Sequence, residues 1–273
     1  MTKKYRFISG LPRSGSTLLT AILNQNPQFK ASISDPLHAY CHSIIRDTES
    51  SVGVGSLVPI EKRKQLMRAL FDSFYADGPD VCFNTNRGWC ADTELLHNLY
   101  PDFRMIVLVR DVPHILNSFE HLHLKNPLTI KPLYHHRDTA NVYERCAILA
   151  GETDLAGYVK GPLVNLASSF VSRHKDNMLY ITYGTLVNYP ADVMRIVYEF
   201  LGEPFYQHDF NNVESSYDEF DDAAKIDGLH TTRRKVEYKK QPRVIPDDLW
   251  QQYKQLNVWE AIDKSTLNWI QGN

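Results

Sequence analysis

The stretch that decides the fold is Gly10-Leu11-Pro12-Arg13-Ser14-Gly15-Ser16-Thr17. It follows a short β-type run, Tyr5–Ser9, and leads into a segment from Thr17 to Gln25 whose apolar residues recur at helical spacing. The two glycines permit a tight turn and let backbone N–H groups approach a ligand closely. A helix start adds partial positive charge and unpaired N–H donors. The stretch therefore predicts a strand–turn–helix unit that binds an anion.

The spacing of the two glycines, followed by Ser16 and Thr17, has the frame of the P-loop that cradles nucleotide phosphates. An NTPase carries a lysine before the final Ser or Thr, because that lysine reaches the β- and γ-phosphates. Here Ser16 occupies the lysine position and Arg13 stands three residues earlier. We interpret the stretch as a phosphate-binding loop whose cation has moved.

Further along the chain, segments of strand type alternate with segments of helical type. Met105–Val109 is an unbroken apolar run typical of a central parallel strand buried on both faces. The pattern predicts an α/β, P-loop NTPase-like three-layer fold, with a central parallel sheet flanked by helices. We expect one domain over residues 1–273, and two amphipathic segments, Asp247–Leu256 and Val258–Trp269, close the chain.

The bulk composition limits the classes of partner. The chain has 273 residues and a formal net charge of -2, so charge gives no support to nucleic-acid binding. No apolar stretch approaches the ~18 residues of a membrane span, and the N-terminus lacks an apolar region of signal-peptide length. We expect a cytoplasmic protein with no membrane partner. The four cysteines match neither a zinc nor a redox spacing, and no metal site is predicted.

A second candidate anion site follows the strongest strand. Arg110 comes directly after that strand, and Ser118 lies eight residues on (118 − 110 = 8), about two turns into the next predicted helix. An arginine fork and a hydroxyl in that arrangement can share one phosphate. The alternative is that Arg110 pairs with Asp111 or another acid. A ligand with phosphates at both ends needs two such sites, whereas an ordinary nucleoside triphosphate does not.

The segment Leu11–Leu18 resembles the 5′-phosphosulfate loop of sulfotransferases that use 3′-phosphoadenosine 5′-phosphosulfate (PAPS), and is closest to their tyrosylprotein and bacterial branch. The order of Arg110 and Ser118 resembles the 3′-phosphate motif of the same family. The resemblance implies PAPS as donor and 3′,5′-bisphosphoadenosine (PAP) as product, with no metal. It also implies that the 5′-phosphosulfate is held by Arg13, Ser14, Gly15, Ser16 and Thr17.

Two later elements resemble the same family. Tyr183, which ends the predicted strand Leu179–Tyr183, corresponds to a tyrosine near the nucleotide, although it could simply pack at a strand end. The basic run from Gly228 to Lys235 includes Arg233 and Lys235, and could close over a phosphate or be a solvated charge run. We expect residues 210–243 to form a cofactor-closing loop and residues about 120–175 a helical acceptor-side region.

The catalytic groups are predicted with alternatives. Arg13 is the first candidate cation. Thr85 stands where the family often has a lysine, and Arg87 could substitute for it. Asp35 or His38 is the candidate base, although Asp35 could be a plain helix N-cap. The remaining fallback bases are His121 and His123.

The function implied is transfer of a sulfuryl group from PAPS to a hydroxyl or amine by in-line displacement. The acceptor is a small molecule or a peptide, and a homodimer is left open. The alternatives are a small-molecule or nucleoside kinase with a P-loop and a non-catalytic nucleotide-binding module. Ser16 in the lysine position disfavours the kinase.

Overall fold

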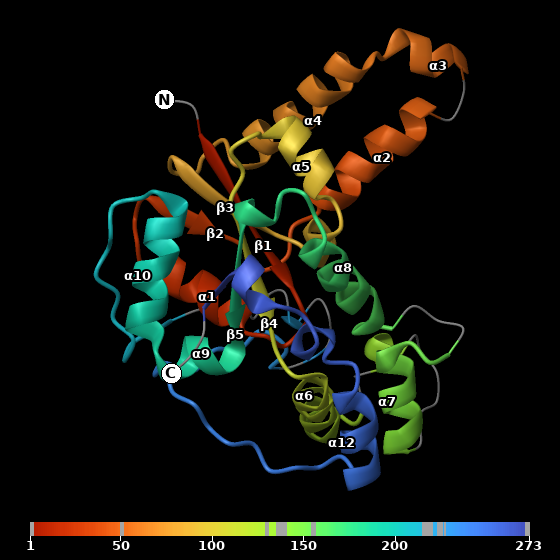
Figure 1. Cartoon of the computed structure of the whole chain (residues 1–273), viewed down its shortest axis with the longest axis vertical. Coiled ribbons are helices and arrows are strands. Elements are labelled where there is room, and N and C mark those ends of the chain that lie inside the picture. Colours follow the sequence, from red (N-terminus) through yellow and green to blue (C-terminus); the bar gives the residue numbers. More distant parts are fainter. Residues whose placement is uncertain are drawn as a thin grey trace.

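The computed structural model describes residues 3–49, 52–128, 131–134, 141–153, 157–214, 221–222, 226 and 228–270. Within these residues a six-stranded sheet has the order β2-β3-β1-β4-β5-β6, and every neighbouring pair is parallel (Figure 1). The predicted α/β fold with a central parallel sheet is confirmed. The strands are β1 (Lys4–Gly10), β2 (Phe29–Ala31), β3 (Val81–Thr85), β4 (Met105–Val109), β5 (Met178–Thr182) and β6 (Asn268–Ile270).

Helices pack on both faces of the sheet. Their bounds are α1 (Ser16–Leu23), α2 (Leu37–Glu49), α3 (Val52–Leu57), α4 (Ile60–Phe74), α5 (Thr93–Leu99), α6 (Val112–Lys125), α7 (Val142–Ala150), α8 (Lys160–Phe170), α9 (Tyr183–Asn188), α10 (Pro190–Leu201) and α12 (Asp247–Lys254). Helices α4, α5 and α8 lie on one face and α1, α9 and α10 on the other, and further helices lie at the ends of the sheet. The 3₁₀ turns are η1 (Arg87–Cys90), η2 (Lys131–Tyr134), η3 (Lys175–Asn177), η4 (Val258–Glu260) and η5 (Lys264–Thr266). No helix in the described part of the chain is long and apolar enough to cross a membrane.

The side chains of strand β4 show that the sheet lies between two layers of helices. All five residues of the strand are buried. Met105, Val107 and Val109 pack into one hydrophobic cluster, which includes residues of α4, α5 and α8. Ile106 and Leu108 pack into the other, which includes residues of α1, α9 and α10. Because side chains alternate along a strand, an unbroken apolar run is buried on both faces, as predicted.

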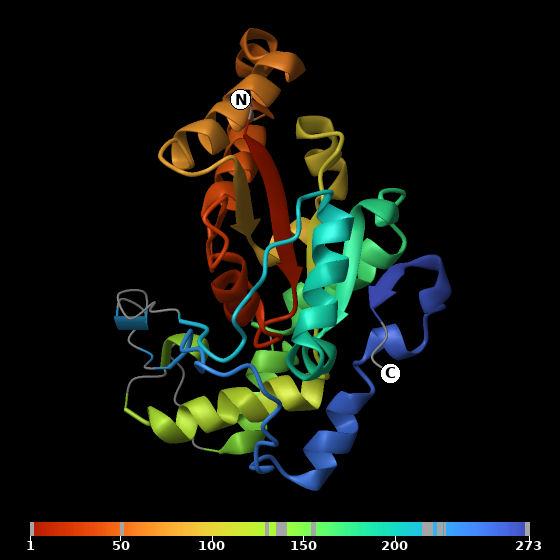
Figure 2. The same cartoon turned by 90° about the vertical axis from the view of Figure 1, so that its left-hand side faces the viewer.

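The carboxyl ends of the strands point toward one end of the molecule, where α6, α7 and α12 gather (Figure 2). Gly10 ends β1 with a φ of 110°, and a Cβ added there would lie 2.1 Å from the carbonyl oxygen of Leu108 in β4. Only glycine permits this approach. The turn after β1 is therefore held directly beside the end of β4.

Two predicted elements differ in the structure. The segment predicted as amphipathic over Val258–Trp269 contains two 3₁₀ turns and then β6, which pairs with β5. Tyr183 begins α9, whereas the sequence predicts it as the end of a strand. Thr182 caps α9 by accepting a hydrogen bond from the N–H of Thr185, which explains why the strand stops there.

A buried ion pair joins α6 to α7. The Nε and Nη2 atoms of Arg145 donate to the two carboxylate oxygens of Glu120 at 2.9 and 2.6 Å. The two side chains are only 8% and 5% exposed. A bidentate pair of this kind fixes α7 in one orientation against α6, at the edge of the region predicted to face the acceptor.

Arg145→Met should lower the free energy of unfolding by about 3–5 kcal/mol, because Glu120 would remain buried without its counter-charge. The double variant Glu120→Leu/Arg145→Met should be more stable than Arg145→Met alone, since no buried charge is then left unpaired. Urea denaturation measures both. A double variant that is less stable than either single variant would contradict this account of the pair.

Candidate functional site

A cavity of about 600 Å³ opens where the carboxyl ends of four strands meet. Gly10 from β1, Thr85 from β3, Arg110 after β4 and Tyr183 after β5 all line it. In open parallel sheets, ligands bind beyond the carboxyl ends of the strands. The motifs singled out in the sequence therefore meet around one space, as the topology requires.

The turn between β1 and α1 forms the wall nearest to the sheet. Gly15 is the N-cap residue of α1 with a φ of 98°, and Gly15, Ser16 and Thr17 line the cavity. Ser14 is fully buried, and its hydroxyl donates to the carbonyl oxygen of Leu11 at 2.5 Å. The hydroxyl of Ser14 is thus engaged within the turn. Of the Ser14 groups predicted to bind the anion, the backbone N–H remains as the candidate donor. The loop offers the donors of a helix start to the cavity.

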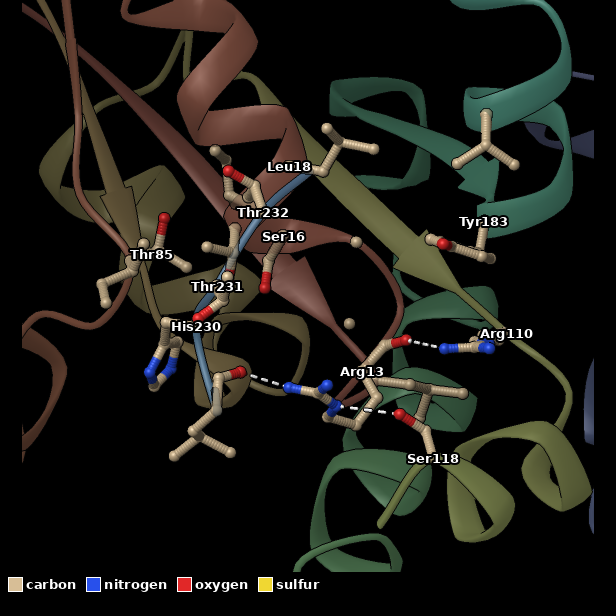
Figure 3. Close-up of a pocket in the computed structure, with 18 of the residues that line it drawn as sticks. Arg13, Ser16, Leu18, Thr85, Arg110, Ser118, Tyr183, His230, Thr231 and Thr232 are labelled. Carbon is tan, nitrogen blue, oxygen red and sulfur yellow. Dashed lines mark hydrogen bonds between the residues drawn. The ribbon is translucent and has the colours of Figure 1, made fainter. Parts of the chain in front are cut away.

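Arg13 brings the two predicted anion sites together. Among the described residues it is the one non-glycine residue with a positive φ, 56°. Its Nε atom donates to the Oγ atom of Ser118 at 3.1 Å, and its carbonyl oxygen accepts from Nη1 of Arg110 at 2.7 Å (Figure 3). The sequence assigns Arg13 to one phosphate and Arg110 with Ser118 to another. In the structure the two groups share a wall.

The positive charge of this wall is only partly compensated. In the described part of the chain no carboxylate forms an ion pair with Arg13, Arg87 or Arg110. Burial, together with the positive charges of Arg110 and Arg87, lowers the pKa of Arg13 to about 10. Burial also lowers the pKa of Arg110. Against these effects, the charges of Asp221 and Asp111 raise the pKa values of Arg13 and Arg110, respectively, without a direct ion pair. Like charges held together without a direct ion pair fit a site that binds a multiply charged anion.

Tyr183 packs between the loop and this charge. The guanidinium of Arg110 lies over its ring, 4.4 Å from the centroid. A Cβ added at Gly15 would lie 3.0 Å from the same ring. Tyr183 lines the cavity and packs against the guanidinium of Arg110, and its predicted contact with the nucleotide stays a prediction.

Residues of the late basic segment line part of the cavity. Arg233 and Lys235 line it, whereas Arg234 turns outward and pairs with Glu214 at 2.9 Å. Nη1 of Arg13 donates to the carbonyl oxygen of Leu229, which ties the segment to the loop. Residues 215–220, 223–225 and 227, within the predicted closing loop, lie outside the described residues.

The family model described as "Sulfotransferase family" matches residues 7–207, which include the loop, Arg110, Ser118 and Tyr183. The chain belongs to the sulfotransferase family. The sulfuryl transfer predicted from the sequence is confirmed by this family match, and the kinase alternative has no such support. No curated protein matches the chain in sequence.

Solved structures similar to this sulfotransferase share its fold at low sequence identity. The sulfotransferase domain from the curacin biosynthetic pathway has a TM-score of 0.53 and 14% identity, covering 94% of this chain and 92% of that one. A sulfotransferase from Mycobacterium avium has a TM-score of 0.52 and 14% sequence identity, and the match covers 96% of this chain and 78% of that one. Retinol dehydratase in complex with androsterone and inactive cofactor PAP has a TM-score of 0.50 and 16% sequence identity, and the match covers 96% of this chain and 82% of that one.

The structure does not bring the carboxylate of Asp35 to the cavity of the sulfotransferase. Ser34, one residue earlier, lines the cavity, but Asp35 does not. Its carboxylate accepts from Ser32, from Tyr75 at 3.0 Å and from the N–H of Thr85 at 2.9 Å. Asp35 is 4% exposed and is occupied as an acceptor. It contacts the end of β3, and this position gives no support to its predicted catalytic role.

His38 is likewise outside the cavity lining. Its Nε2 atom lies 2.6 Å from Oδ2 of Asp92, and Nε2 of His42 lies 2.9 Å from the same oxygen. The three ligand-type atoms lie within 4.8 Å of one another, close enough to hold a metal ion. Asp92 stands at the N-cap of α5 but makes no side-chain capping bond. The predicted catalytic role of His38 therefore has no support in its position.

Two residues without a role in the sequence prediction line the cavity. The Oγ1 atom of Thr85 is buried and has no hydrogen-bond partner among the described residues. His230 lines the cavity beside Leu229. Neither role has a signal in the sequence, because Thr85 replaces a lysine expected from the family and His230 stands in a run whose predicted role depends on its cations.

Asp35→Ala should lower the free energy of unfolding by about 1–3 kcal/mol, because Tyr75 and the N–H of Thr85 would lose their acceptor. Asp77→Ala, which removes an exposed acid, should change stability by less than about 0.5 kcal/mol. Urea denaturation of the two variants makes the comparison. A variant Asp35→Asn that keeps full stability yet loses all activity would restore the prediction of a catalytic Asp35.

Proposed function

We propose that this sulfotransferase takes its sulfuryl group from PAPS and transfers it to a hydroxyl or amine of a small-molecule acceptor. The single observation that carries the proposal is the cluster of three arginines, Arg13, Arg87 and Arg110, beside the start of α1 on one cavity. PAPS bears anionic groups at both ends of its ribose. It therefore matches a site with donors at both ends better than a singly phosphorylated nucleotide does.

The 5′-phosphosulfate belongs at the loop in this proposal. Backbone N–H groups of Ser14 to Thr17 and the hydroxyls of Ser16 and Thr17 are the donors at the start of α1. The side chain of Arg13 lies at the edge of this group, toward Ser118. It can bridge the two ends of the donor and stabilise charge that develops on the leaving phosphate.

The 3′-phosphate belongs between Arg110 and Ser118. The hydroxyl of Ser118 is buried on α6 and faces the guanidinium of Arg13. Tyr183 holds Arg110 by a cation–π contact. Arg233 and Lys235 add positive charge from the late segment, which supports the predicted role of that segment in closing over the cofactor.

The sulfuryl group faces the end of β3. The buried hydroxyl of Thr85 lies there and has no hydrogen-bond partner among the described residues. A bound ligand is the simplest partner for such a group at the wall of a cavity. Arg87 lines the same side of the cavity and stands in for the lysine expected from the family resemblance. The pair supplies donors to the sulfuryl oxygens as the bond to the leaving phosphate breaks.

The acceptor side is partly apolar. Leu133 and Ile226 are buried residues of the cavity wall, and Tyr158 lies with them. A partly apolar wall and a volume of about 600 Å³ suit a small molecule. The androsterone bound to the similar retinol dehydratase is a ligand of that class. The cytoplasmic location, the homodimer and the acceptor role of residues 120–175 stay predictions.

PAP should stabilise the protein and ATP with magnesium should not. At about 100 times its Kd, PAP adds about 2.7 kcal/mol, which raises the Tm of a chain of this size by roughly 5–10 °C. Differential scanning fluorimetry with each nucleotide makes the test. Stabilisation by ATP with magnesium, and none by PAP, would overturn the donor assignment.

Arg110→Ala should weaken PAP binding by about 1.5–3 kcal/mol, a loss of roughly 10- to 150-fold, because a charge-assisted contact to the 3′-phosphate is removed. Adenosine 5′-monophosphate should be affected much less. Calorimetric titration of wild type and variant with each nucleotide gives the two dissociation constants and the fold-loss of affinity for each. Arg234→Ala, whose guanidinium pairs outward with Glu214, is the matched control and should leave both affinities unchanged. Equal losses for the two nucleotides in Arg110→Ala and in Ser118→Ala would contradict the 3′-phosphate site.

A further inference from the structure

His230 and Asp221 form a paired unit at the wall of the cavity. Nδ1 of the His230 ring lies 2.7 Å from Oδ1 of Asp221. The backbone N–H of His230 donates to Oδ2 of the same carboxylate at 2.9 Å. The side chains are 13% and 8% exposed. One buried carboxylate thus fixes both the backbone and the ring of His230.

This contact determines which ring nitrogen can accept a proton. A carboxylate is an acceptor only, so the Nδ1 atom that faces it carries the hydrogen in the neutral ring. The Nε2 atom of a neutral ring then carries the lone pair. A carboxylate behind Nδ1 also stabilises the imidazolium that forms when Nε2 takes up a proton. The pair has the arrangement of a general base and its orienting group.

The position of His230 places this base beside the reacting groups. Arg13 donates to the carbonyl oxygen of Leu229, the residue before His230. Figure 3 shows His230 and Thr85 on the same side of the cavity, with Arg13 between them and Ser118. The charge of Arg87, which follows β3 and lines the same cavity, acts on the His230 ring, so the ring lies within electrostatic reach of the part of the cavity where the proposed function places the sulfuryl group.

The surroundings keep His230 ready to accept a proton. Burial lowers its pKa, the hydrogen bond and charge of Asp221 raise it, and the charges of Arg13 and Arg87 lower it. A histidine must be neutral to act as a base at physiological pH. The neighbouring arginines and the burial favour that neutral form.

Among the described residues that line the cavity, only Glu237 competes as a proton acceptor at neutral pH. Its carboxylate pairs with Lys239 at 3.0 Å and with Lys235 at 3.4 Å. Hydrogen bonds to these two lysines lower the pKa of Glu237, which makes it a weak base. The remaining polar side chains of the wall are arginines, lysines, tyrosines, hydroxyls and amides.

We propose that His230, oriented by Asp221, is the general base that removes the proton of the acceptor during sulfuryl transfer. The proposal rests on the proposed function. As the acceptor oxygen or nitrogen forms its bond to sulfur, the bond between sulfur and the bridging phosphate oxygen breaks and its electron pair stays on PAP. The proton of the acceptor moves to Nε2 of His230. Asp221 is a positioning residue that stays ionised.

Three variants test the proposal, with PAPS as donor and 2-naphthol as a generic hydroxyl acceptor. The slow hydrolysis of PAPS, with water as acceptor, is a second readout. His230→Gln should lower kcat by about 10²–10⁴-fold, the usual contribution of a general base. It should retain the stabilisation by PAP. The control His42→Gln changes a half-exposed histidine outside the cavity lining, and it should leave kcat and the stabilisation by PAP unchanged.

Asp221→Asn gives a test that a merely structural role would not meet. The carboxylate accepts from two N–H groups, whereas an amide has one acceptor oxygen and must turn its NH₂ toward one of them. Turned toward the ring, the NH₂ reverses the tautomer and puts the hydrogen on Nε2. We expect a large loss of kcat with little change in PAP binding. The remaining activity should have its acid limb at lower pH, because the group that raises the pKa of His230 is gone.

The outcomes separate this proposal from the proposed function. If the wild type binds no PAP, the proposed function fails. If His230→Gln keeps kcat within about threefold of the wild type while PAP still stabilises it, the base assignment fails and the proposed function stands. If His230→Gln loses PAP binding together with activity, His230 holds the donor and is not the base. Lost kcat with retained PAP binding in both variants supports the proposal.

Discussion

The backbone of Arg13 passes through the left-handed region, and three parts of the cavity wall meet on this one residue. Its carbonyl oxygen receives Arg110 from the end of β4, its Nε atom reaches Ser118 on α6, and its guanidinium also binds the carbonyl oxygen of Leu229. The close approach of Gly10 to Leu108 holds the turn where these contacts can form. Strain at a single residue is thus balanced by contacts from three distant segments.

The same contacts concentrate positive charge. Arg13 and Arg110 are held close together, partly buried, and none of the described carboxylates forms an ion pair with them. Such an arrangement costs stability in the absence of an anion and strengthens the binding of an anion that fits it. Tyr183 reduces the cost, because its ring faces the guanidinium of Arg110 and the Gly15 turn leaves room for it. Stability and affinity for the donor are therefore coupled at this wall.

The elements whose positions the sequence predicted correctly share one property. Their positions along the chain follow from the local spacing of apolar and polar residues. Met105–Val109 is a strand buried on both faces because its apolar run leaves it no other environment. Arg110 and Ser118 meet at the cavity because eight residues of strand end and helix bring them to one side. Tyr183 follows β5 for the same reason, since parallel strands end at one edge of the sheet.

The side chains that the sequence misplaced depend on packing across the chain. Ser34 faces the cavity and its neighbour Asp35 does not, because Tyr75 and the N–H of Thr85 claim that carboxylate. The segment over Val258–Trp269 ends in a strand only because the edge of β5 accepts it.

The sequence by itself determined the fold and the residues that line one wall of the cavity, since glycine positions, apolar runs and strand ends are local properties. Only the tertiary structure decided that Arg13 contacts both Ser118 and Arg110 and that the buried Thr85 hydroxyl has no hydrogen-bond partner in the described part of the chain. It also decided that Asp221 faces His230. The physical reason is that hydrogen-bond partners in irregular segments follow from the path of the whole chain, which no periodicity encodes.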